Sequence, residues 1–145
     1  MSEPILERIQ DDTRTAMKAG ERDRVGTLRM IASSLQQDEK EGKGDAVAVL
    51  QRERKKRIEA AEAFESGGRA EQAAAERGEA ALIESYLPEQ ISDEDLAAIV
   101  AAAVESTGAT TAKETGKVIG VVMPQVKGRA DGKRVSTMVR ERLGA

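Results

Sequence analysis

The chain has almost no aromatic side chains. Its 145 residues include one phenylalanine, Phe64, one tyrosine, Tyr86, and no tryptophan. A hydrophobic core must therefore be built from Ala, Val, Ile, Leu and Met. Charged residues make up 34% of the chain and alanine is abundant, a composition that favours helices packed on helices. The sequence thus predicts an all-α protein, long enough for one domain or two small ones.

Cysteine and histidine are both absent. Without cysteine the chain has no disulfide, no thiolate zinc site and no cysteine nucleophile. Without histidine it lacks the commonest general base and the commonest metal ligand. Carboxylates are plentiful, but their helical spacings are those of solubilising charge pairs, and no residue is marked to activate Ser33 or Ser34. We therefore expect no catalytic residues, no metal and no cofactor.

The sequence also carries no sign of a membrane segment. No apolar stretch approaches the roughly 18 residues that a spanning helix needs. The N-terminal residues lack the basic start and the apolar run of a signal peptide. We expect a cytoplasmic protein that does not bind membranes.

Apolar residues recur with a helical period through the first 87 residues and predict four helices. The first ends near Gly20, and the second ends in the charged, glycine-broken stretch 38–44. The third begins after a capping Asp45 and ends at the glycines 67–68, and an alanine-rich fourth runs from about 69 to 86. The core positions expected in the first three helices are Ile5, Leu6, Ile9, Thr13, Ala16 and Met17; Val25, Leu28, Ile31, Ala32 and Leu35; and Val47, Leu50, Ile58, Ala61 and Phe64.

Pro88 marks the predicted domain boundary, because proline disfavours helical backbone at the residue before it. We expect an N-terminal domain, 1–87, made of two helical hairpins, and a C-terminal three-helix bundle, 88–145. Ser92 and Asp95 form a capping box at the start of the fifth helix. The core positions expected in the fifth and last helices are Leu96, Ile99, Val100, Ala103 and Val104, and Val135, Met138, Val139 and Leu143.

The segment 117–123 is ambiguous. Its β-branched residues favour a strand, but the chain offers no second strand to pair with its backbone. The segment is therefore predicted to be a short helix. In that helix Gly116 and Gly120 lie one turn apart, where a neighbouring helix could approach closely.

The charge of the chain reverses toward its end. Residues 109–145 carry a net charge of +5 and the whole chain −3, so residues 1–108 carry −8. The basic, glycine-punctuated loop 127–134 leads into a helix N-terminus, where free N–H groups and the helix dipole favour an anion. This layout suits a polyanionic partner such as RNA. The candidate phosphate-binding residues are Lys117, Lys127, Arg129, Lys133 and Arg134.

A plainer interpretation of this loop is structural: Asp131 caps the helix, the glycines permit a turn and the basic side chains are solvated. The loop is not a nucleotide P-loop, because Gly128 and Gly132 enclose three residues instead of four. With aromatic side chains so scarce, RNA contacts would be to the backbone and shape of a folded duplex. Such binding is expected to be weak, salt-dependent and poorly sequence-specific.

The densest positive run, at 52–57, is predicted to be mostly a solvated helix face. Helical geometry places Arg54 within the apolar stripe, where an unpaired charge would be costly. Glu79 or Glu84 on the next helix could be its partner. Arg77 is also expected to point inward. Two interpretations stay open: a buried ion-pair lattice, or a cleft that positions an acidic partner.

Four segments of the sequence resemble the YqeY proteins: 27–31 (TLRMI), 51–57 (QRERKKR), 86–90 (YLPEQ) and 116–135. These proteins share their domain, the GatB/YqeY domain, with the tail of the B subunit of the tRNA-dependent glutamine amidotransferase. The match covers essentially the full length, as in a stand-alone YqeY protein. The resemblance implies an all-helical protein with a C-terminal three-helix bundle. It also implies kinship with a carbon–nitrogen ligase that uses glutamine as amido donor, in which the tail contacts tRNA and the chemistry lies elsewhere.

Three functions are therefore considered. The first is a tRNA-associated accessory module that binds tRNA, or a tRNA-handling protein complex, through its C-terminal bundle and has no catalytic set of its own. The alternative is a protein–protein adaptor that docks a partner through acidic N-terminal helices. The third and least favoured is an amide-transfer enzyme in its own right.

Overall fold

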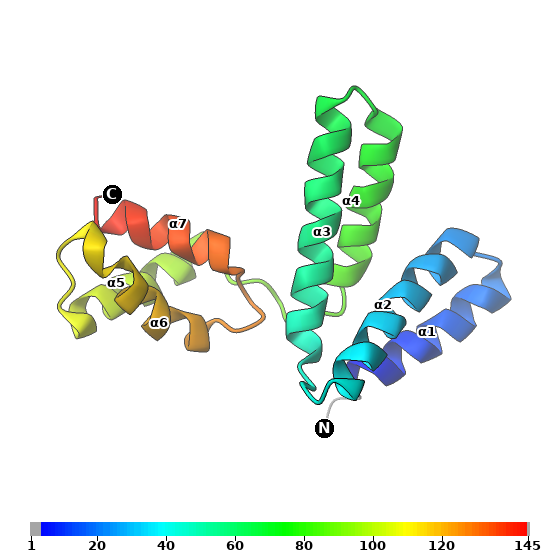
Figure 1. Cartoon of the computed structure of the whole chain (residues 1–145), viewed down its shortest axis with the longest axis horizontal. Coiled ribbons are helices and arrows are strands. Elements are labelled where there is room, and N and C mark those ends of the chain that lie inside the picture. The colour runs from blue at the N-terminus through cyan, green and yellow to red at the C-terminus, as the bar shows by residue number, and fades with distance from the viewer. Residues whose placement is uncertain (1–3, 145) are drawn as a thin grey trace. The chain divides into compact units, whose positions relative to one another are not determined.

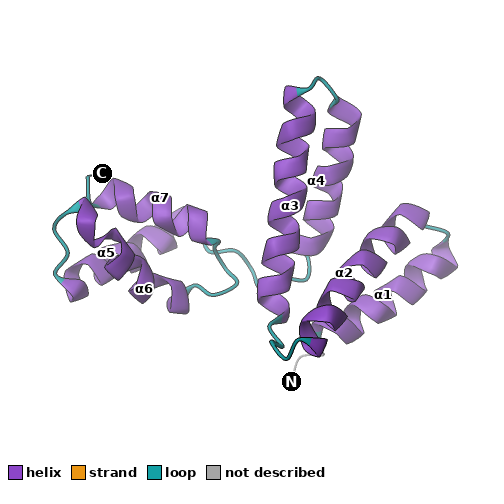
Figure 2. Cartoon of the chain, in the orientation of Figure 1, coloured by secondary structure: helices purple, strands orange, loops and turns teal. Residues whose placement is uncertain are grey.

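The computed structural model describes residues 4–144, and all regular structure within them is helical (Figures 1 and 2). The all-α prediction is confirmed. By their contacts the helices divide into two compact units, Met1–Leu87 and Pro88–Ala145. The first unit contains α1 (Ile5–Ala19), α2 (Arg22–Lys40), α3 (Ala46–Ser66) and α4 (Ala70–Glu84). The second contains α5 (Asp93–Thr107), the 3-10 turn η1 (Ala112–Glu114), α6 (Thr115–Gln125) and α7 (Gly132–Arg142).

Local sequence signals explain where several helices begin and end. The carboxylate of Asp45 and the hydroxyl of Ser92 each accept a hydrogen bond from the amide three residues later, both at 3.1 Å. Each bond satisfies a backbone donor that the first turn of a helix leaves unpaired. Helices α1 and α5 end at Gly20 and Gly108, whose φ angles of 74° and 70° lie in the left-handed region that glycine adopts without strain. Among the described residues, no helix has the length and apolar character needed to cross a membrane.

In the N-terminal unit, α1 pairs with α2 and α3 with α4, and the two hairpins lie at an angle to each other (Figure 1). Tyr86 is 4% exposed, and its hydroxyl donates a hydrogen bond to Asp12. Burial, together with this bond, raises the pKa of Tyr86. The tyrosine is therefore a packing residue. One aliphatic cluster spans both hairpins and comprises Ile9, Ala16, Leu28, Ile31, Leu35, Val49, Leu50, Ile83 and Tyr86.

A buried arginine links the two hairpins of this unit. Arg57 on α3 is 8% exposed and donates to Glu53 at 3.2 Å and to Glu79 of α4 at 3.0 Å. The other oxygen of each carboxylate accepts a hydrogen bond from a hydroxyl of α2, Glu53 from Ser34 at 3.0 Å and Glu79 from Thr27 at 3.3 Å. Both carboxylates thus bridge the arginine and α2, so the buried charges are compensated.

The predicted ion-pair lattice exists, but Arg57 and not Arg54 lies at its centre. The side chain of Arg54 is 27% exposed, and its Nε lies 3.5 Å from Glu84, one of the two partners predicted for it. The other predicted partner, Glu79, forms a salt bridge with Arg57 instead. The error is one of helical register, because charged residues interrupt the buried stripe of α3. That stripe consists of Val49, Leu50, Glu53, Arg57 and Ala61.

Two side chains expected in the core are exposed. Arg77 lies on the surface and pairs with Glu65 of α3 at 2.7 Å. Met17 is 53% exposed, because the buried stripe of α1 runs through Ile9 and Ala16, and Met17 lies about 100° further around the helix than Ala16. The apolar stripe of α1 is therefore narrower than the sequence suggested.

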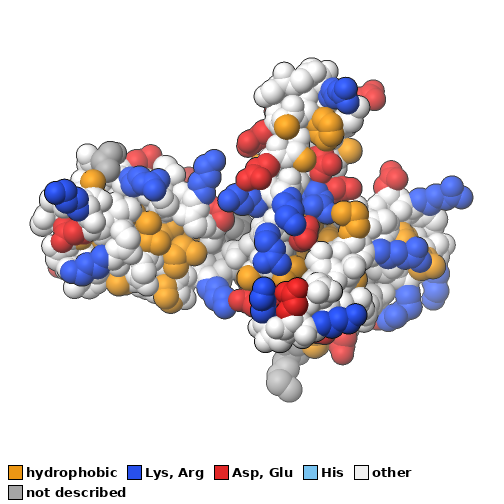
Figure 3. Space-filling view, in the orientation of Figure 1, with side chains coloured by type: hydrophobic (Ala, Val, Ile, Leu, Met, Phe, Trp, Pro, Cys, Tyr) orange, Lys and Arg blue, Asp and Glu red, His pale blue; other side chains and the backbone are white. Residues whose placement is uncertain are grey.

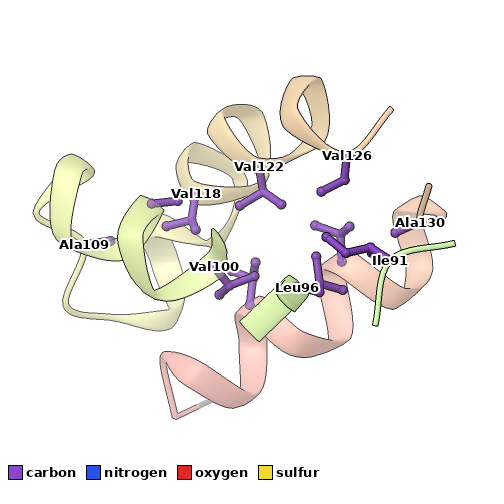
Figure 4. Packing of buried hydrophobic residues seen from close by; sticks show 11 residues of the cluster. Ile91, Leu96, Val100, Ala109, Val118, Val122, Val126 and Ala130 are labelled. Carbon is purple, nitrogen blue, oxygen red and sulfur yellow. The ribbon is translucent and has the colours of Figure 1, made fainter. Parts of the chain in front are cut away.

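The C-terminal unit packs three helices around an aliphatic core (Figure 4). In Figure 4 Leu96 and Val100 of α5 point toward Val118 and Val122 of α6. The ambiguous segment 117–123 is helical, as predicted. The core is completed by Ile91, Ala103, Ala109, Val126, Ala130, Val135 and Val139.

The close helix approach predicted at Gly116 and Gly120 is wrong. A Cβ added at either glycine would meet no other atom within 4 Å. Both residues are exposed, because α6 packs through the opposite face, which carries Val118 and Val122. The two glycines therefore have no packing role among the described residues.

The buried lattice predicts an asymmetry between two arginines of α3. Arg57→Ala leaves the buried carboxylate of Glu53 with only the more distant and exposed Lys56, at 3.8 Å, and should lower the free energy of unfolding by about 3 kcal/mol. Arg52→Ala, at an exposed position of the same helix, should change it by less than about 0.5 kcal/mol. Urea unfolding followed by tyrosine fluorescence measures this unit alone, because Tyr86 is the only tyrosine of the chain. Equal midpoints for the two variants would contradict the network.

Candidate nucleic-acid interface

The loop between α6 and α7 is held by the segment that leads into α5. The side-chain amide of Gln90 donates to the carbonyl oxygen of Gly128 at 3.0 Å, and the N–H of Ile91 donates to the carbonyl oxygen of Arg129 at 2.9 Å. Gly128 has a φ of 79°, which glycine adopts readily. The hydrogen bond between Gln90 and Gly128 thus joins two of the segments that carry the family resemblance, 86–90 and 116–135.

Apolar residues at both ends of the loop are buried. Val126 and Ala130 are both 0% exposed. The carbonyl oxygen of Val126 accepts hydrogen bonds from the N–H groups of Arg129 at 2.8 Å and Ala130 at 3.3 Å. The side chains of Lys127 and Arg129 lie on the exposed positions between them. The loop is therefore a compact turn that presents basic side chains to solvent.

The start of α7 is occupied by the protein's own carboxylate. Asp131 accepts a hydrogen bond at 2.8 Å from the N–H of Arg134, which is the capping role of the plainer interpretation. The guanidinium of Arg134 donates to Asp93 of α5 from Nη2 at 2.6 Å and from Nε at 3.2 Å. Arg134 thus links α7 to α5, and its backbone and side chain are both engaged within the unit.

The remaining candidate, Lys117, lies in the first turn of α6 and not at the loop. The helix continues for about 12 Å from Lys117 to its end at Gln125, and the loop begins only after it. Glu114, just before α6, accepts hydrogen bonds from the N–H groups of Thr110 at 2.6 Å and Thr111 at 3.1 Å. These bonds, and the nearby charge of Lys117, lower the pKa of Glu114. The structure therefore groups Lys127, Arg129 and Lys133 in one segment and leaves Lys117 apart.

The net charge of +5 counted over residues 109–145 does not describe a structural unit, because the C-terminal unit begins at Pro88. The C-terminal unit contains eight basic and eight acidic residues, so its net charge is zero, and the N-terminal unit carries −3. Figure 3 shows blue and red side chains together on this unit. Positive charge is therefore a local property of the loop. The acidic residues that precede 109 in this unit are Glu89, Asp93, Glu94, Asp95 and Glu105.

Two residues important for this geometry were missed by sequence reasoning. Gln90 positions the loop, and Asp93 engages Arg134 across 41 residues of sequence. Gln90 stands at the end of the segment 86–90 that carries the family resemblance, which was the available signal. Within residues 4–144, His, Cys, Asp and Glu side chains form no group of three or more that could hold a metal ion.

The fold and this loop define a class: a small helical protein of two units, with a basic loop held between the last two helices of the second. The model of the YqeY-like protein family matches residues 6–143. The chain belongs to this family, as the resemblance of its sequence segments indicated. A comparison with curated proteins finds no match.

The hydrogen bonds to Glu114 predict a measurable titration. Because they lower its pKa, the carboxyl group should titrate in a carbon-detected NMR experiment with a midpoint below the usual value of about 4.3. A folded-state pKa below the unfolded one stabilises the protein above the unfolded pKa, and this stabilisation is lost as the pH falls through the folded pKa. Glu114→Gln should therefore reduce the loss of stability on acidification. A midpoint at or above about 4.3 would contradict the hydrogen bonds from Thr110 and Thr111 to Glu114.

Proposed function

We propose that the protein is a cytoplasmic, tRNA-associated accessory module that contacts RNA phosphates through residues 127–133. The observation that carries this proposal is the hydrogen-bonded loop, which presents exposed basic side chains on a fixed backbone. The contacting residues are Lys127, Arg129 and Lys133. The resemblance to the amidotransferase tail, which contacts tRNA, supports tRNA as the polyanion.

The geometry supports phosphate contact better than base recognition. A loop whose backbone is already fixed loses little backbone conformational entropy when its side chains meet a ligand. Tyr86 is buried, so it offers no exposed ring on which a base could stack. Three phosphate contacts release about three counterions, which gives a slope of log K against log salt of roughly −2 to −3. The zero net charge of the unit adds no long-range attraction.

In this proposal Arg134 positions the loop, and Lys117 is a secondary contact. Arg134 positions the start of α7 through Asp93, so its loss should disturb the loop without removing a direct phosphate contact. Lys117 contributes only if the bound RNA extends along α6.

No reaction is assigned to the protein itself. Ser34 does donate to Glu53, but that carboxylate is already bonded to Arg57.

The proposal predicts that one group of three basic residues matters and another does not. The variant with Lys127, Arg129 and Lys133 changed to alanine should bind unfractionated tRNA at least tenfold more weakly at 50 mM salt. Its slope of log K against log salt should be smaller by about 2 to 3. Filter binding at several salt concentrations measures both quantities.

The matched control changes Lys113, Arg140 and Arg142 to alanine, which removes the same charge from exposed positions of the same unit. It should retain most of the affinity. Equal losses in the two triple variants would show that only net charge matters. Absence of binding by the unaltered protein at low salt would reject the tRNA proposal and favour the adaptor function.

A further inference from the structure

The N-terminal unit has a hollow surface around the first turns of α2. One hollow, of about 630 Å³, lies between α2 and α4, and a second, of about 520 Å³, lies between α2 and the end of α1. Arg22 and Gly26 line both hollows, so the two flank the same stretch of α2. Leu82 lines the first, and Met17 and Val25 line the second. We call the combined region the Gly26 surface.

The Gly26 surface exposes apolar groups in an unusual concentration for this chain. Met17 and Met30 are 53% and 54% exposed, and they are the two large hydrophobic side chains that lie exposed among the described residues. Met17 lines the second hollow, and Met30 lies one turn beyond Gly26 on the same side of α2. Exposed methionines are flexible, polarisable groups that suit protein-binding surfaces.

The Gly26 surface is lined by three arginines and three carboxylates, and these charges are not all paired with one another. Arg22 and Arg29 both line the second hollow and form no salt bridge with a carboxylate of residues 4–144. The neighbouring Glu21 and Glu79 are already paired with arginines of this unit. Asp23 lies in the first turn of α2, where the helix dipole stabilises a carboxylate. Figure 3 shows several blue side chains along the α1–α2 hairpin.

We propose that the Gly26 surface docks an amphipathic helix of a partner protein, one that carries carboxylates beside its apolar stripe. The apolar side chains of this helix occupy the hollows beside Met17 and Leu82, and its carboxylates meet Arg22 and Arg29. A helix laid along α2, over both hollows, follows the usual helix-in-groove mode of recognition. The site is separate from the loop 127–133 and does not depend on its binding RNA.

Charge and polarity select this occupant over two others. RNA would use the arginines but would leave the exposed side chains of Met17 and Met30 without an apolar partner. A second copy of the chain, docked through the same surface, would bring Arg22 and Arg29 against themselves, and like charges across an interface oppose association. An acidic, apolar helix satisfies both features of the surface.

The test is peptide display on the full-length protein with a library of helical peptides that carry randomised surface positions. We expect enriched sequences to combine Leu, Ile or Phe at helical spacing with adjacent Asp or Glu. The best peptide is then titrated against three proteins by fluorescence anisotropy. Gly26→Leu, which fills the hollow at a position where an added Cβ meets nothing within 4 Å, should weaken binding at least tenfold. Arg22→Glu/Arg29→Glu should do the same.

A charge exchange provides the decisive control. The enriched peptide with its acidic residues changed to Lys should bind the Arg22→Glu/Arg29→Glu variant at least tenfold more tightly than it binds the unaltered protein. Circular dichroism establishes that each variant is folded. The proposal is overturned if no sequence is enriched, if the enriched sequences are basic, or if neither substitution changes the affinity. It is also overturned if duplex RNA, or self-association of the chain, displaces the peptide from this surface.

Discussion

Two hydrogen bonds from the residues after Pro88 set the geometry of the basic loop, and the proposed RNA contact depends on them. Gln90 and Ile91 each bind a carbonyl of the turn between α6 and α7, while Val126 and Ala130 anchor its ends in the core. All of these partners belong to the C-terminal unit. The proposed interface is therefore a property of that unit alone.

The two units use charge in different ways. In the N-terminal unit charge is structural, because Arg57 and its two carboxylates join the hairpins beside the aliphatic cluster that spans them. In the C-terminal unit the acidic start of α5 offsets the basic tail, and Asp93 holds Arg134 beside it. Net charge over a stretch of sequence is thus a poor guide to a surface, because folding pairs charges that lie far apart in the chain.

Much of the fold could be predicted from the sequence because its signals are local. The caps Asp45 and Ser92, and the helix at 117–123, follow from backbone chemistry within a few residues. The rotational register of α3 could not be predicted, because its buried stripe contains Glu53 and Arg57, which periodicity counts as exposed. The exposure of Gly116 and Gly120 and the contact of Gln90 with Gly128 also depend on which helix lies nearby. One sequence does not contain that information.

The proposed RNA contact requires that the basic loop is rigid before it meets any ligand. Backbone ¹⁵N relaxation of the free protein tests this most directly at the amides of Gly128, Arg129 and Ala130. We expect order parameters of about 0.85, the value of rigid backbone. Values below about 0.6 at these amides would show a flexible loop and would contradict a preformed phosphate-binding site.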